Sequence, residues 1–121
     1  MDAATFVRTY YDALRAGDPL APFFADGPQV VKVGISERLV GGDAVAAGLR
    51  EQTATTADWT VDSRDLRVVE DGDWACFADE VGMAWTGEDG HHEFDSRWSG
   101  TLHREEDWTF VGMHVSAPTP L

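Results

Sequence analysis

The sequence predicts an α+β fold in which helices from the first half of the chain cover a strongly bent antiparallel sheet. Apolar residues recur at helical spacing before residue 55, whereas residues 59–116 divide into four extended segments joined by short, turn-forming links. Links of this length join only antiparallel neighbours. A chain of 121 residues with this pattern makes a single domain, which we expect over residues 1–116, followed by a frayed tail over 117–121.

Three helices are expected in the first half of the chain. The first has Asp2 at its N-cap and Gly17 just past its end. The second is short and follows the Asp-Pro pair at 18–19, because proline suits the first turn of a helix. The third covers residues 43–53, where an aspartate can cap the first turn.

Strands are expected wherever apolar and β-branched residues alternate between turn residues. A short strand over residues 29–35 turns back at 36–37, which predicts a hairpin. In the first long segment the apolar residues change parity, which predicts a bulge or sharp bend between Ser63 and Asp65. The four long segments are Trp59–Glu70, Trp74–Thr86, His91–His103 and Trp108–Ser116.

The second long segment carries one acid, Asp79, on an otherwise apolar face. If a four-residue loop pairs Thr86 with His91, Trp98 lies opposite Asp79 on the same face. We therefore expect Asp79 to lie in an apolar pocket. The residues predicted to line this pocket are Phe77, Val81, Met83, Trp85, Trp98 and Trp59.

The last segment is apolar on both faces. Alternation from Trp108 puts His114 on the inner face and Val111, Met113 and Val115 on the outer face. Helices on one side of a sheet leave its second face uncovered, so something else must cover this one. We expect a second copy of the chain, and hence a homodimer joined through the outer face.

Acidic residues dominate the charge, with 22 Asp and Glu against 9 Lys and Arg and a net charge of -13. This balance argues against nucleic acid as a partner. It favours the acidic surface of a halophilic protein, because dense carboxylates stay hydrated in strong salt that also screens their repulsion. An acidic mesophilic protein is the alternative.

The remaining composition predicts a cytoplasmic protein without cofactor or metal. The single cysteine, Cys76, excludes an internal disulfide and favours a reducing compartment. The apolar runs are far shorter than the ~20 residues of a membrane span, and the start lacks the features of a signal peptide. The segment His91-His92-Glu93 has no third metal ligand at a suitable spacing, and the glycines form no phosphate-binding motif.

Three segments resemble one known superfamily. They are Tyr10–Asp18, Leu39–Val45 and Trp108–Ser116, the last with a Trp...His-x-Ser ending. Together with the order of elements, they resemble the nuclear transport factor 2-like superfamily, and within it the SnoaL-like proteins related to polyketide cyclases and ketosteroid isomerase. The resemblance implies a cone-shaped barrel, a pocket between helices and sheet, and a homodimer joined through the outer face of the sheet.

Few of the functional residues known in the superfamily have a counterpart in this sequence. Tyr10 falls where ketosteroid isomerases keep a tyrosine that hydrogen-bonds the substrate oxygen. The position of the isomerase's basic aspartate falls on Lys32 or Val33, and that of its acid donor falls near Trp98 to Gly100. Isomerisation by that mechanism is therefore not expected.

Two functions fit these observations, both with a small apolar or mixed-polarity organic ligand. In a cofactor-independent isomerase, cyclase or dehydratase, Asp79 and His114 would exchange protons and Tyr10 would polarise a carbonyl group. In a non-catalytic dimerisation or ligand-sensing module, the same three side chains would make structural hydrogen bonds. Fold alone does not choose between these functions.

Overall fold

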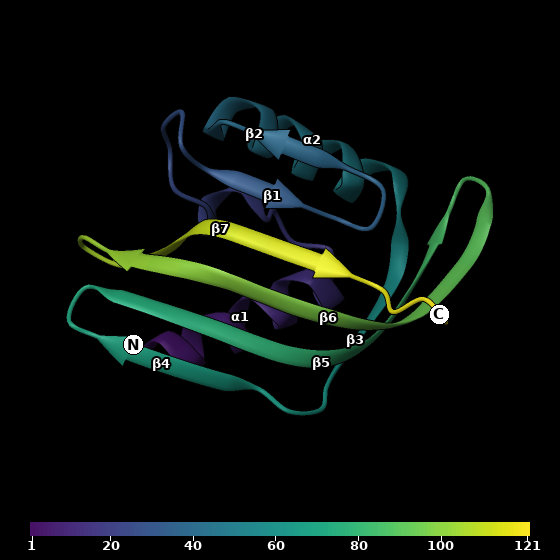
Figure 1. Cartoon of the computed structure of the whole chain (residues 1–121). Coiled ribbons are helices and arrows are strands. Elements are labelled where there is room, and N and C mark those ends of the chain that lie inside the picture. The colour runs from purple at the N-terminus through teal and green to yellow at the C-terminus, as the bar shows by residue number, and fades with distance from the viewer.

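The chain forms one open sheet with both helices on the same side, as Figure 1 shows for the computed structural model, which describes residues 1–121. The helical elements are α1 (Ala3–Ala16), a 3₁₀ turn η1 (Ala21–Phe23) and α2 (Gly42–Thr55). The strands are β1 (Val31–Val33), β2 (Arg38–Val40), β3 (Ala57–Ser63), β4 (Arg67–Asp71), β5 (Trp74–Gly87), β6 (Gly90–Arg104) and β7 (Trp108–Ser116). Their order is β2-β1-β7-β6-β5-β3, with β4 also paired to β5. The predicted α+β class is confirmed, although the sheet does not close into a barrel.

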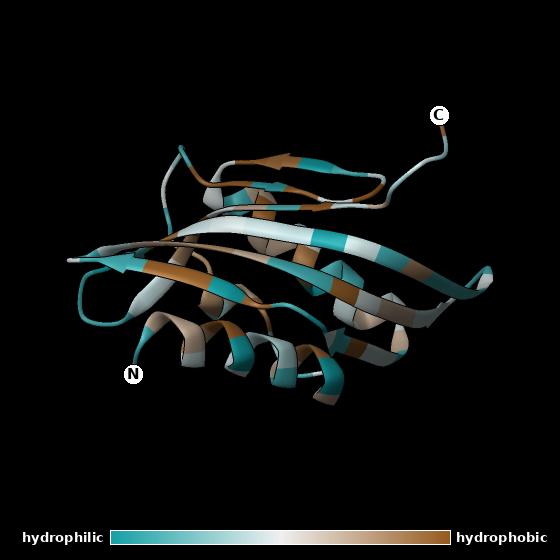
Figure 2. Cartoon of the chain, turned by 60° about the horizontal axis from the view of Figure 1, so that its bottom comes forward, coloured by the Kyte–Doolittle hydropathy of each residue, from teal (hydrophilic) through white to brown (hydrophobic).

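The first helix begins and ends where predicted. The Asp2 carboxylate accepts a hydrogen bond from the Thr5 amide at 2.7 Å, and Gly17 ends the helix with a left-handed φ of 73°. Hydrophobic and hydrophilic residues alternate along α1 in Figure 2. The apolar stripe faces the sheet, which buries Tyr10 and Tyr11 between helix and strands.

The other predicted helices are partly wrong. The second is only the turn η1, because Phe24 leaves it in an extended conformation and pairs with Phe110 of β7. The chain therefore has two α-helices rather than three. The cap of α2 is Gly41, which has no side chain to accept a hydrogen bond, rather than Asp43. Neither helix is long and apolar enough to cross a membrane.

Helix α2 packs closely on the β1–β2 hairpin. A Cβ atom at Gly48 would collide with the side chain of Leu39 on β2. Glycine therefore permits the close approach, although it weakens a helix interior by about 1 kcal/mol. This contact fixes α2 and the hairpin as one wall of the cavity described below.

The pairing of the long strands largely follows the prediction. Asp79 lies opposite Trp98, and Thr86 lies opposite His91. The predicted bend between Ser63 and Asp65 separates β3 from β4, both of which pair with β5. However, β1 pairs in parallel with β7, so the sheet is mixed rather than antiparallel. The lengths of local links say nothing about two strands so far apart in the chain.

The last strand contains a β-bulge. Leu102 of β6 pairs with Phe110, whereas the preceding Thr101 pairs with Gly112, so that Val111 is an extra residue in β7. The three-residue turn before β7 has the predicted length, because Arg104 pairs with Trp108. The alternation of faces is therefore right up to Phe110 and reversed after it.

The bulge overturns the predicted facing of the last residues. Met113 and Val115 are buried, at 3% and 8% exposure, whereas His114 is exposed. The predictions that His114 faces inward and that Met113 and Val115 face outward are therefore wrong. Apolar residues occur at both odd and even positions of this segment because of the bulge, and not because both faces of the sheet are covered.

Candidate functional site

The main cavity lies between α1, α2, the β1–β2 hairpin and the inner face of the sheet, with a volume of about 470 Å³. Ten of its 19 lining residues are hydrophobic. Strands β3, β5 and β6 contribute Trp59, Met83, Trp85 and Trp98, which are four of the six predicted pocket residues. The other two, Phe77 and Val81, are buried in the core at 3% and 0% exposure and do not line the cavity.

Aromatic rings make up much of the cavity wall. The rings of Trp59 and Trp85 stack with their centroids 4.8 Å apart. The Trp98 indole donates a hydrogen bond to Ser96 at 2.9 Å, so its nitrogen is already satisfied within the sheet. The Trp59 indole likewise donates a hydrogen bond to the Thr56 hydroxyl at 2.8 Å. These two indoles therefore offer flat apolar surface to a ligand rather than hydrogen bonds, whereas the Trp85 indole nitrogen has no acceptor within the protein.

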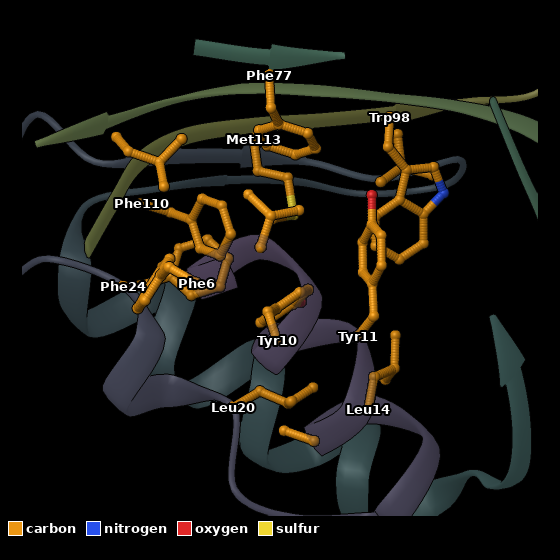
Figure 3. Packing of buried hydrophobic residues seen from close by; sticks show 14 of the residues in the cluster. Phe6, Tyr10, Tyr11, Leu14, Leu20, Phe24, Phe77, Trp98, Phe110 and Met113 are labelled. Atoms are coloured by element: carbon orange, nitrogen blue, oxygen red, sulfur yellow. The ribbon is translucent and has the colours of Figure 1, made fainter. Parts of the chain in front are cut away.

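Tyr10 reaches the cavity from α1. Its ring packs edge-on against Phe110 and Trp98, as part of the aromatic cluster in Figure 3. Its hydroxyl makes no hydrogen bond to another residue, although the side chain is almost fully buried. Burial, and secondly the negative charge of Glu37, raise the pKa of Tyr10, so it stays a neutral donor facing the cavity.

Asp79 belongs to a structural network outside the main cavity. Its carboxylate accepts hydrogen bonds from the Tyr11 hydroxyl at 2.9 Å, the Ser63 hydroxyl at 2.6 Å and the Asp65 amide at 3.0 Å. Burial, followed by the charge of Asp79, raises the pKa of Tyr11 and keeps its hydroxyl a donor. Figure 3 shows the Tyr11 hydroxyl pointing from α1 toward the sheet, beside Trp98. With three donors in place, Asp79 pins α1 and the β3–β4 bend to β5.

The predicted convergence of Asp79, His114 and Tyr10 on one pocket is wrong. One shallow hollow touches both Asp79 and His114, but the Asp79 carboxylate is bonded to the helix side of the sheet. His114 projects from the opposite side because of the bulge in β7. Only Tyr10 of the three lines the main cavity.

The structure reveals an ion pair in the cavity that the sequence analysis did not assign to the site. Lys32 of β1 is 5% exposed, and its ammonium donates a hydrogen bond to the Glu37 carboxylate at 2.5 Å. The only lysine of the chain lies between two valines in a predicted strand, and this unusual position is the feature of the sequence that could have indicated a functional charge. No group of three or more His, Cys, Asp or Glu side chains is placed to hold a metal ion.

The bent sheet, the helices on its inner face and the cavity between them match the fold of solved structures from the nuclear transport factor 2-like superfamily. A candidate dehydratase of that superfamily from Streptomyces avermitilis matches with a TM-score of 0.86 and 18% identity, over 97% of this chain and 94% of that chain. A superfamily member from Salmonella enterica matches with a TM-score of 0.81 and 16% identity, over 96% and 88%. A candidate scytalone dehydratase from Novosphingobium aromaticivorans has a TM-score of 0.80 and 14% identity, over 96% and 81%. Identities this low show a shared fold alone.

A family model described as the SnoaL-like domain matches residues 4–120. The chain therefore belongs to the SnoaL-like family, and the resemblance inferred from its residues is confirmed. No protein of curated function matches the sequence significantly.

Proposed function

We propose that the protein binds a small organic molecule of apolar or mixed polarity in the main cavity. The observation that carries this proposal is the cavity itself, whose volume of about 470 Å³ and aromatic wall are typical of small-molecule sites. Several polar groups reach the same space, among them the Tyr10 hydroxyl, the pair formed by Lys32 and Glu37, and the side chains of Glu51 and Gln52 on α2. Such groups orient a ligand whose apolar body fills the rest.

Ligand binding can be followed by the intrinsic fluorescence of the cavity tryptophans. We expect aromatic and alicyclic ketones, alcohols and acids to change this fluorescence. The variant Gln52→Trp should fill the cavity from α2 and weaken binding by at least about tenfold, which is ~1.4 kcal/mol. Arg50→Trp is the matched control, because Arg50 is exposed on α2 and does not line the cavity. Equal binding by both variants would contradict the proposal.

A second candidate function is cofactor-independent isomerase, cyclase or dehydratase chemistry. One observation favours it: Tyr10 places a protonated hydroxyl without a protein acceptor at the cavity wall. Such a donor can polarise a carbonyl oxygen. Turnover of a hydroxyketone panel that falls about 100-fold in Tyr10→Phe, with ligand binding retained, would support catalysis over binding alone.

We also propose a homodimer through the outer face of the sheet. Two cross-strand rows on that face contain no acidic residue, although the chain has 22 of them. One row is Val69, Cys76, Thr101, Gly112, Val31 and Val40, and the next is Arg67, Ala78, Ser99, His114, Val33 and Arg38. Since the net charge is -13, two copies approach with least repulsion over these two acid-free rows, which Asp71 and Glu80 flank on the same face.

Sedimentation velocity tests the dimer. We expect Thr101→Asp to yield a monomer, because it puts a carboxylate in the middle of one of the two acid-free rows. Ala47→Asp on the exposed side of α2 adds the same charge elsewhere and should leave the dimer intact. A wild-type monomer at tens of micromolar protein would overturn this arrangement.

A further inference from the structure

The alternation of β1 brings the only lysine of the chain into the cavity. Lys32 pairs with Leu39 on β2 and with Met113 on β7, and both of these neighbours line the cavity. Val31 and Val33, on either side of it, belong to the outer face. An ammonium has three N–H donors, and only one is used within the protein, in the bond to Glu37. Lys32 therefore has unused donors beside a cavity in which ten of the 19 lining residues are hydrophobic.

The two members of the ion pair differ in their access to water. The side chain of Lys32 is 6% exposed, whereas that of Glu37 is 38% exposed and follows the turn between β1 and β2. Glu37 can therefore turn outward and be hydrated at little cost. Lys32 has no such route, and an unpaired buried ammonium is strongly unfavourable. Whatever displaces Glu37 must bring a negative charge of its own.

The Tyr10 hydroxyl adds a second unused donor to the same cavity wall. It has no acceptor in the protein, and the charge of Glu37 acts on it. Lys32 and Tyr10 thus supply donors, while Glu37 is the resident acceptor. A ligand complementary to this arrangement carries acceptor oxygens and no donor at that end.

We propose that the cavity selects organic monoanions, in which a carboxylate replaces Glu37 on Lys32 and accepts a hydrogen bond from Tyr10. The apolar body of the ligand then lies against Trp59, Trp85 and Met83. The exchange conserves charge, because one carboxylate leaves the ammonium as another arrives. This inference rests on the proposed function, which it refines from any small organic molecule to an aromatic or alicyclic carboxylate.

Two probes of nearly equal shape distinguish the binding of any small organic molecule from the selection of a carboxylate. We choose 2-naphthoate, which carries the carboxylate, and 2-naphthamide, which is neutral. Binding of the neutral amide reports on the cavity as a small-molecule site, and the affinity ratio of naphthoate to naphthamide reports on carboxylate selection. Both are measured by calorimetry on the full chain, in high salt that screens the net charge of -13.

Three variants make the test specific. Glu37→Gln removes the internal competitor, so naphthoate affinity should rise about tenfold while naphthamide affinity changes little. Lys32→Met should lower the naphthoate to naphthamide ratio by about tenfold or more. Glu51→Gln removes a carboxylate that also lines the cavity but does not bond Lys32, and should leave the ratio within about twofold. Because one lysine is present, selective labelling gives a single side-chain signal that naphthoate should shift.

Each of the following outcomes would overturn either carboxylate selection or the small-molecule function. If the affinity ratio of naphthoate to naphthamide is unchanged in Glu37→Gln, carboxylate selection is overturned. This variant keeps the buried Lys32, so the test does not depend on whether Lys32→Met folds. Equal gains in Glu37→Gln and Glu51→Gln also overturn it, because the effect would then be long-range charge. If neither probe binds the wild-type protein or Glu37→Gln, the small-molecule function itself fails.

Discussion

The two buried charges of this protein, Asp79 and Lys32, are each 5% exposed but have opposite surroundings. Asp79 accepts hydrogen bonds from three protein donors on two segments of the chain, α1 and the β3–β4 bend. Lys32 has one protein partner, the Glu37 side chain, which is 38% exposed, and it otherwise faces the cavity. Burial therefore does not by itself distinguish a structural charge from one that can meet a ligand. The difference lies in whether the protein has already supplied every partner.

The largest effect should follow removal of the Asp79 carboxylate. Asp79→Ala leaves three donors in or near the core without an acceptor, so we expect a loss of about 3 kcal/mol in the free energy of unfolding. Lys32→Met leaves only the half-exposed Glu37 unpaired and should cost about 1 kcal/mol or less. Urea denaturation of both variants measures the contrast. Equal losses would show that the two charges have the same role.

A smaller effect should separate the adjacent tyrosines. Tyr11→Phe removes a donor to a buried carboxylate and should lower the free energy of unfolding by about 2 kcal/mol. Tyr10→Phe removes a hydroxyl without a protein acceptor and should change it by less than about 0.5 kcal/mol. The same denaturation experiment applies. A larger loss in Tyr10→Phe would indicate that its hydroxyl is structural.

Alkaline pH should act on both tyrosines together. Their pKa values lie above the ordinary 10.0 in the folded protein, chiefly through burial, and these are the only two tyrosines in the chain. Above pH 10 the unfolded chain loses phenolic protons that the folded chain keeps, so stability falls as pH rises further. Absorbance at 295 nm should therefore stay low until the protein unfolds. A gradual rise near pH 10 in the folded state would contradict the burial of both hydroxyls.

The smallest effect on stability per carboxylate is expected for the acidic residues of the exposed surface. Exposed acids far outnumber bases, and the repulsion among them is screened to ~3 Å at 1 M salt but extends to ~10 Å at 0.1 M. If the surface is halophilic, dilution to about 0.1 M salt should lower the melting temperature through the sum of many weak terms. Asp79→Ala should keep the same salt dependence, because its carboxylate is not part of that surface. A melting temperature independent of salt would exclude the halophilic interpretation.

Local patterns in the sequence were sufficient for much of the sheet. The turn residues fixed the β5–β6 register, and the change of parity located the bend at residues 63–65. The parallel pairing of β1 with β7 was beyond such patterns, because it joins strands remote in the chain. The bulge at Val111 was missed because alternation was assumed to continue along β7, although apolar residues on both parities indicated otherwise.

The candidate site was harder to predict than the sheet. Aromatic residues on the inner faces were placed from parity, and four of the six predicted pocket residues line the cavity. Parity also placed Asp79 opposite Trp98, but it did not predict the hydrogen-bond partners of the charged residues, because these come from distant segments. Tyr11 lies 68 residues before Asp79, and no local pattern links them. Glu37 is five residues after Lys32, across a turn that the sequence did predict, so this pair was within reach.

The extra residue in β7 also has a genetic consequence. The bulge takes up Val111 as an extra residue, so that Met113 and Val115 face the cavity beyond it. Loss of the Val111 codon would leave Phe110 directly before Gly112, and the regular ladder that results would keep Met113 and Val115 facing inward with the same partners. Relatives that lack this single residue would thus keep the same stripe of cavity side chains. A change of one codon is therefore tolerable at the bulge, whereas the same change in a regular part of the strand would exchange its two faces.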